Sequence, residues 1–282
     1  MTHLTHSWPY PMRRFLFIVG AMKCGTTSLF RHLEHHPEVC VPSTKKEPDF
    51  FGDSNNWERG IDWYVSNWNF DQNKHRIAVD ASTNYSKIPS FPNAAERISE
   101  IKRTYHDVRF RFIYMMRDPI RRIESQLGHE YLEGRRPLRA RLHPSHLSIS
   151  DYYKQISEYY RRFDKDDILL LNFDDLVSAP EETMRRVCRF AGIDDNHSFN
   201  TLSSVFNPTA GREVNLSVAY RRMKKFIPWR SGQFLDKKIR AYVKSRAKLT
   251  EAEKAYVIRE IGPSLKLLEQ YEFDISGWRS LG

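Results

Sequence analysis

Residues 20–28, called the glycine loop below, have the composition of an anion-binding loop. They contain two glycines five positions apart, Gly20 and Gly25, with one lysine, Lys23, between them. Thr26 follows the second glycine and is expected to begin a helix. Backbone N–H groups at a helix N-terminus, together with the positive end of the helix dipole, bind negatively charged groups. The loop is therefore predicted to bind a phosphate or sulfate group, and the alternative is an ordinary glycine turn.

The loop departs from the ATP-binding pattern G-x-x-x-x-G-K-[ST] at one position. The pattern requires a lysine after the second glycine, where it reaches the β- and γ-phosphates, and this chain has Thr26 there. Its lysine, Lys23, comes three residues earlier, near an α/β bridging position. That place suits a nucleotide with one phosphate and one further leaving-group bond. A P-loop kinase or NTPase stays open as an alternative, with Asp80 as the Mg²⁺ ligand it would need.

A second candidate anion site follows the apolar stretch that ends at Met116. Arg117 comes directly after this expected strand, and Ser125 lies eight residues further on, about two turns along an expected helix. Ligands of open parallel sheets bind beyond the carboxyl ends of the strands. An arginine fork and a hydroxyl suit a phosphate monoester. The alternative is that Asp118 caps the helix and Arg117 makes a surface ion pair.

The two stretches together resemble a known pair of motifs. The forms G-x-x-K-x-G-T-T-x-L and R-D-P-x-x-R-x-x-S are similar to the 5′-phosphosulfate and 3′-phosphate motifs of sulfotransferases that use 3′-phosphoadenosine 5′-phosphosulfate (PAPS). The likeness is greatest to the carbohydrate-directed branch, such as the heparan sulfate sulfotransferases. It implies PAPS as cosubstrate, adenosine 3′,5′-bisphosphate (PAP) as product, and no metal. The nucleotide-binding residues it implies are Lys23, Cys24, Gly25, Thr26, Thr27, Ser28, Arg117, Ser125, Gly211 and Arg212.

The same resemblance suggests which residues do the chemistry. Lys23 would stabilise the leaving phosphate. The stretch E-P-D-F-F beginning at Glu47 resembles the E-x-x-F-F element whose glutamate is the general base. The alternative for Glu47 is an exposed loop residue paired with Lys45 or Lys46. His129 competes for the role of base, since cytosolic sulfotransferases use a histidine.

Residues 80–85 resemble the E-K-S-x-x-Y segment that lines the acceptor cleft of the family, although Ala81 replaces the lysine. The resemblance implies a hydroxyl acceptor, such as that of a glycan or glycolipid. The substrate-binding residues it implies are Glu47, Asp80, Ser82 and Asn84.

Strand and helix patterns alternate through the first two thirds of the chain, which predicts an α/β fold with a parallel sheet flanked by helices on both faces. A single domain over residues 1–282 is expected, with a core at about 14–200 and a nucleotide-closing loop and basic helical cap at about 201–282. The expected strands are 15–19, 76–80, 108–116 and 167–173. The expected helices include 26–36, 57–68, 94–105, 119–132 and 150–163, then one with a capping box at Ser178 and Glu181, and one with a capping box at Thr250 and Glu253.

Composition limits the choice of partner. The formal charge of +10 over 282 residues favours an anionic partner. No helix-turn-helix, zinc or RNP pattern is present, so no nucleic-acid partner is expected, although a non-catalytic nucleic-acid-binding module stays an alternative. The basic residues of 135–141 and those after 212 could bind an acidic acceptor or a membrane surface, but a solvated face is favoured. Three cysteines without metal-site spacing and no long apolar run predict a cytoplasmic protein without a membrane anchor.

Overall fold

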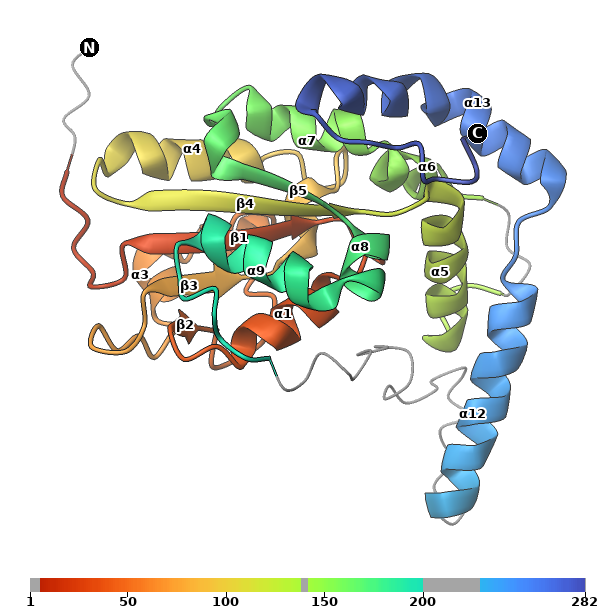
Figure 1. Ribbon diagram of the computed structural model, residues 1–282, viewed down its shortest axis with the longest axis horizontal. Coiled ribbons are helices and arrows are strands. Elements are labelled where there is room, and N and C mark those ends of the chain that lie inside the picture. The colour runs from red at the N-terminus through yellow and green to blue at the C-terminus, as the bar shows by residue number, and fades with distance from the viewer. Residues whose placement is uncertain (1–5, 138–141, 200–228, 282) are drawn as a thin grey trace. The chain divides into compact units, whose positions relative to one another are not determined.

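The computed structural model describes residues 6–137, 142–199 and 229–281. These divide into two compact units (Figure 1). The first, called the sheet unit, comprises Met1–Arg117 and Asp151–Val205; the second, called the helical unit, comprises Asp118–Ser150 and Phe206–Gly282. The single domain expected over 1–282 stays a prediction.

The sheet unit contains five parallel strands in the order β2-β3-β1-β4-β5. The central strand β1 pairs with β4, with Phe17 opposite Phe112. The parallel sheet is confirmed, and the one strand that the sequence did not suggest is β2, whose two residues are too few to form a pattern. The strands are β1 Arg14–Gly20, β2 Val39–Cys40, β3 Ile77–Asp80, β4 Arg109–Met116 and β5 Ile168–Asn172.

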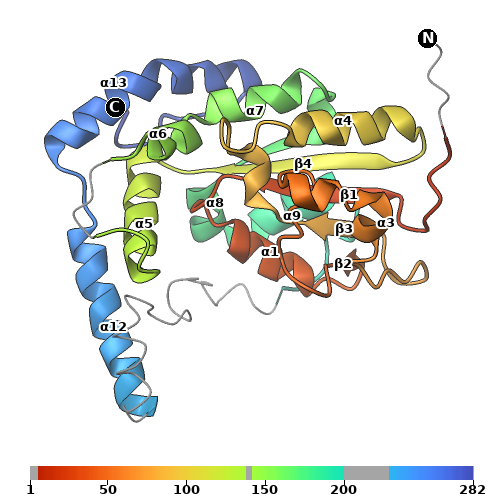
Figure 2. The same cartoon turned by 180° about the vertical axis from the view of Figure 1, so that it is seen from behind.

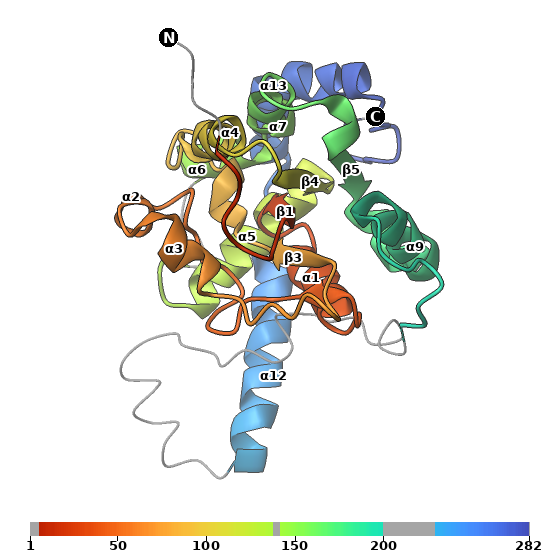
Figure 3. The same cartoon turned by 90° about the vertical axis from the view of Figure 1, so that its left-hand side faces the viewer.

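Helices cover both faces of this sheet, as predicted. Figure 3 shows α1 and α9 on one face and α4 and α7 on the other, and Figure 2 shows the same elements from behind the view of Figure 1. The apolar side chains between these layers form the core, and every residue of β1 from Phe15 to Gly20 is buried. The helices of the unit are α1 Thr26–Glu34, α2 Ser54–Trp57, α3 Gly60–Val65, α4 Ala94–Thr104, α7 Tyr152–Tyr160, α8 Phe173–Ser178 and α9 Pro180–Ala191, with 3-10 turns η1 Thr83–Ser86 and η2 Lys165–Asp167.

The capping box expected at Ser178 and Glu181 is wrong. Ser178 ends α8, and its hydroxyl donates to the Asp174 carbonyl at 2.9 Å instead of capping the next helix. The N-cap of α9 is Ala179, with Pro180 in the first turn. A proline suits this position because the first helical N–H has no partner within the helix.

The helical unit is built from α5 Pro119–Leu132, α6 Pro144–Ser150, α12 Trp229–Arg246, α13 Glu251–Lys266 and the 3-10 turn η3 Leu267–Tyr271. Its α5 matches the predicted helix, whereas α6 is a helix that the sequence did not suggest. Leu132 packs against Val243 of α12 and against Ala247, which follows that helix directly. The described part beyond residue 228 is helical with connecting turns, as expected of a C-terminal helical cap, and the capping box at Thr250 and Glu253 is confirmed.

Candidate active site

The glycine loop joins β1 to α1 in the way its sequence predicts. Gly20 ends β1, and Gly25, with φ of 88°, is the N-cap of α1. A Cβ added to Gly25 would lie 2.5 Å from the ring of Phe173, so both the backbone conformation and the space require glycine. The N-terminus of α1 has no side-chain cap and no acidic residue in its first turn. Its backbone N–H groups can therefore serve a bound anion.

Contacts in the protein interior connect the glycine loop to the residue that follows β4. Cys24 is fully buried, and its Sγ lies 3.7 Å from the hydroxyl of Tyr152. That hydroxyl donates to the Arg117 carbonyl at 2.8 Å. The Cys24 side chain thus faces the interior, whereas Lys23, with φ of 72°, is half-buried in the turn. Thr26 is buried in the first turn of α1, and Thr27 is half-buried.

Arg117 follows the last residue of β4 and lies against an aromatic ring. Its guanidinium carbon is 4.6 Å from the centre of the Phe173 ring. Its Nε is buried and has no hydrogen-bond partner among the described residues. An unpaired buried donor is costly, so this atom fits a bound acceptor such as a phosphate oxygen. The Phe173 ring also fills the space beside Gly25. The glycine of the first motif and the arginine of the second therefore lie next to the same ring.

The other residues of the second motif belong to the helical unit. Ser125 is half-buried on α5, and Asp118 caps that helix by accepting from the Arg121 N–H at 3.0 Å. His129 lies one turn beyond Ser125 and pairs at 3.2 Å with Glu133, the C-cap residue of the same helix. The structure thus places Ser125 and Arg117 in different units. Gly211 and Arg212 lie outside the described residues.

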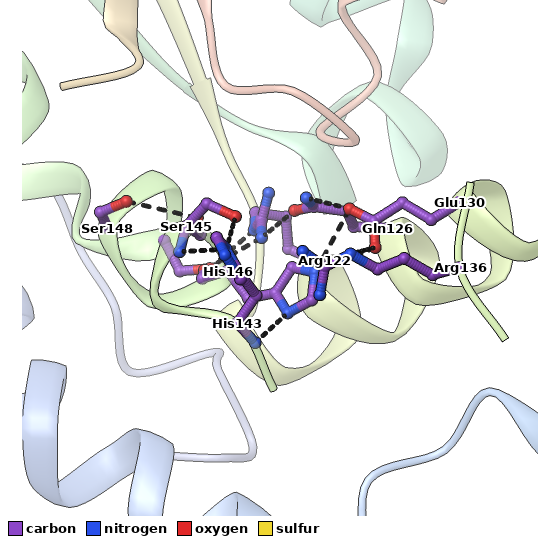
Figure 4. A network of polar contacts seen from close by, with 9 residues as sticks. Arg122, Gln126, Glu130, Arg136, His143, Ser145, His146 and Ser148 are labelled. Carbon is purple, nitrogen blue, oxygen red and sulfur yellow. Dashed lines mark hydrogen bonds and ion pairs between the residues drawn. The ribbon is translucent and has the colours of Figure 1, made fainter. Parts of the chain in front are cut away.

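A buried polar network fixes the helix that carries Ser125 and His129 (Figure 4). Arg122 is fully buried and donates to Ser150 Oγ at 2.7 Å and to Gln126 Oε1 at 2.6 Å. Gln126 donates to Glu130, which also pairs with the fully buried His146 at 3.2 Å. Burial acts to raise the pKa of Glu130, but hydrogen bonds from His146 and Gln126 outweigh it and lower the pKa to about 2. The second arginine of the R-D-P-x-x-R motif is therefore structural.

Glu47 is held between two side chains. Its Oε1 lies 3.0 Å from Lys46 Nζ, and its Oε2 accepts from the Thr83 hydroxyl at 3.4 Å. Lys46 Nζ also donates to the hydroxyl of Thr27 in the glycine loop at 3.3 Å. A continuous chain of contacts thus links the candidate base to the candidate anion loop. The ion pair with Lys46 is the one that the sequence offers as an alternative for Glu47, whereas nothing in the sequence indicates the contacts with Thr27 or with Thr83 of the 80–85 segment.

The two aromatic residues after Glu47 anchor its loop in the core. Phe50 and Phe51 are almost completely buried. The Phe50 ring stacks on Tyr64 with 4.8 Å between ring centres, and the Phe51 ring meets Phe17 of β1 at 5.7 Å. The backbone just ahead of them is therefore fixed to the central strand.

Asp80 and Ser82 lie in the interior. The Asp80 carboxylate accepts from the Ser82 N–H at 3.0 Å and from the hydroxyls of Tyr64 and Tyr85. Burial raises the pKa of Asp80 to about 6, and these hydrogen bonds oppose the rise. Their full burial favours a positioning role for Asp80 and Ser82 over direct contact with an acceptor. Asn84 is half-buried and donates to the carboxylate of Asp49.

Two further observations concern the described residues. They include no group of three or more histidine, cysteine, aspartate or glutamate side chains placed to bind a metal ion. Of the helices described here, none has the length and apolar character needed to cross a membrane.

The sequence is similar to those of known proteins of one family. The model of the sulfotransferase family matches residues 16–197. Mouse heparan sulfate glucosamine 3-O-sulfotransferase 3A1 is 26% identical over 211 residues, which cover 69% of this chain and 49% of the relative. Human heparan sulfate glucosamine 3-O-sulfotransferase 6 is 29% identical over 217 residues, covering 71% of this chain and 58% of the relative. The chain therefore spans about half the length of these curated relatives.

A solved structure supports the fold. The crystal structure of a sulfotransferase from Alicyclobacillus acidocaldarius superimposes with a TM-score of 0.65 at 20% identity, covering 94% of this chain and 98% of that one. Together with the family match over more than half of the chain, this fold completes the assignment: the protein belongs to the sulfotransferase family.

Proposed function

We propose that the protein transfers a sulfuryl group from PAPS to a hydroxyl of an acceptor. When bound, PAPS supplies a sulfuryl group whose bond to the 5′-phosphate breaks as the acceptor oxygen bonds to sulfur. The glycine loop fits this nucleotide because it offers uncapped N–H groups and an adjacent lysine, Lys23. Arg117 fits a phosphate because its buried Nε has no partner among the described residues. The assignment of Ser125 and Arg212 to the 3′-phosphate stays a prediction of the motifs.

Within this proposal each charged side chain has a task. Lys23 stabilises negative charge on the leaving phosphate. Glu47 accepts the proton of the acceptor hydroxyl. A carboxylate has about four lone-pair sites, and the contacts with Lys46 and Thr83 use two of them. A bound hydroxyl can therefore reach the same carboxylate without displacing its partners.

The observation that carries the proposal is the chain of contacts from Thr27 through Lys46 to Glu47. It supports Glu47 as the base because it joins the carboxylate to the loop that would hold the nucleotide. His129 instead pairs with Glu133, the C-cap residue of its own helix. We infer that the acceptor is a glycan or glycolipid hydroxyl, as the heparan sulfate relatives suggest. A cytoplasmic location and a peripheral membrane contact stay predictions.

Calorimetry with PAP and transfer assays with radiolabelled PAPS test this function. The wild-type protein should bind PAP, and Lys23→Ala should weaken binding by about 10- to 100-fold, the value of one hydrogen bond to a charged group. Desulfated heparan sulfate and a panel of glycolipids serve as acceptors. Failure to bind PAP, together with hydrolysis of ATP above background, would instead support a P-loop NTPase.

A further inference from the structure

Lys46 contacts two parts of the candidate active site. Its Nζ lies 3.3 Å from Thr27 Oγ1 and 3.0 Å from Glu47 Oε1, so one ammonium group contacts both the glycine loop and the candidate base. Its side chain is 20% exposed, and Nζ also lies 5.9 Å from the centre of the Phe30 ring on α1. Its neighbour Lys45 is exposed.

An ordinary ion pair would not explain this placement. An exposed lysine–glutamate pair contributes only about 0–1 kcal/mol and does not need a third partner. Here the lysine side chain is only 20% exposed, and its ammonium bridges two segments that are 19 residues apart in the chain. Lysine has three N–H donors. Contacts among the described residues use two of them, so one donor can serve a ligand oxygen.

The position of this donor indicates which part of the ligand it would reach. In the proposed reaction the loop holds the 5′-phosphate, and Glu47 takes the proton from the attacking hydroxyl. The sulfuryl group that moves between them must then lie between the loop and the carboxylate. Lys46 Nζ is in contact with both.

We propose that Lys46 binds the sulfuryl group of the donor nucleotide and holds Glu47 beside it. This inference rests on the proposed function. It makes Lys46 a second cation of the transfer site, in addition to Lys23, and one that arrives from a different segment. Because PAP lacks the sulfuryl group, Lys46 should distinguish PAPS from PAP, whereas a residue that binds the phosphates would not.

The test compares Lys46→Met, Lys46→Arg and Lys45→Met by calorimetry with PAP and with PAPS in the absence of acceptor, and by steady-state kinetics. Lys46→Met should bind PAP within about twofold of wild type but PAPS about tenfold more weakly, as expected for one lost hydrogen bond to a charged group. Its kcat should fall by about 100-fold, the cost of one oxyanion donor. Lys46→Arg should restore much of the PAPS affinity, and Lys45→Met should match wild type.

Equal weakening of PAP and PAPS by Lys46→Met, or no change in either, would overturn the role of Lys46. A thermal unfolding midpoint close to that of wild type shows that the variant is folded, and Lys46→Arg gives a second reading if Lys46→Met unfolds. Failure of the wild-type protein to bind PAP would overturn the proposed function itself. The two failures are therefore distinguishable.

Discussion

The guanidinium of Arg117 lies over the ring of Phe173, 4.6 Å from its centre. The same ring fills the space beside Gly25, where a Cβ would be only 2.5 Å away. Phe173 begins α8, directly after β5, so a residue outside both sequence motifs sets the spacing between the glycine loop and Arg117. Its shape should therefore matter for nucleotide binding.

Replacement of Phe173 by leucine should weaken PAP binding by about 3- to 30-fold. The reason is that Arg117 loses a cation–π contact worth about 0.5–2 kcal/mol and is less well oriented. Calorimetry measures the effect. Phe190→Leu is the matched control, because the Phe190 ring of α9 lies 5.4 Å from the guanidinium carbon of a different arginine, Arg111. An equal loss in both variants would show that the effect is general destabilisation.

Gly25→Ala should abolish measurable PAP binding and lower the free energy of unfolding by more than about 1–3 kcal/mol. The variant has a strained positive φ, which alone costs about that amount, and a clash with the Phe173 ring. Gly60→Ala isolates the first effect, since Gly60 has φ of 80° and nothing within 4 Å of an added Cβ. It should be mildly destabilised in urea unfolding and should bind PAP normally.

Glu47→Gln should lower kcat by about 10²- to 10⁴-fold, the usual contribution of a general base. PAP affinity should change little, because the amide keeps the shape of the side chain. Steady-state transfer assays give kcat for both variants, and His129→Gln should remain within a few-fold of wild type. The reverse outcome, with His129→Gln inactive and Glu47→Gln active, would transfer the role of base to His129.

Asp80→Asn should change how stability depends on pH. Burial raises the folded-state pKa of Asp80 from 3.8 to about 6, so the folded state binds the extra proton between these values. The contribution of Asp80 to the free energy of unfolding should therefore be greatest below about pH 4. It should fall by up to about 3 kcal/mol as pH rises to about 6.

The difference between wild-type and Asp80→Asn unfolding curves measures this contribution, because the asparagine does not titrate. The free energy of unfolding of the variant should rise relative to that of wild type between about pH 4 and pH 6, and the difference should then become constant. Asp166→Asn, at an exposed aspartate of the same unit, is the control and should follow wild type throughout. A constant gap across this range would contradict the raised pKa.

The parts of the fold that were predictable have strong local patterns. The apolar runs of β1 and β4 and the Pro119 start of α5 needed no tertiary information. The sequence does not suggest the short elements β2 and α8. Without α8, Ser178 is predicted to cap the following helix, whereas it is the last residue of α8. Two to six residues carry too little periodicity to be recognised.

The motif residues of the site were predictable from their spacing, but their partners were not. Lys46 contacts Thr27 across 19 residues of chain, and Thr83 contacts Glu47 across 36. Phe173 takes part only because β5 pairs with β4. Such contacts depend on strand order, which a single sequence does not specify.

All three cysteine thiols are buried in different parts of the sheet unit, namely the glycine loop, the strand β2 and the helix α9. Burial raises the pKa of Cys40 to about 11 and of Cys188 to about 12, so alkylating reagents meet little thiolate in the native state. Alkylation of these cysteines therefore requires local unfolding that exposes the thiol. The protein thus carries three natural probes whose labelling rates would report separately on the stability of a turn, a sheet edge and a covering helix.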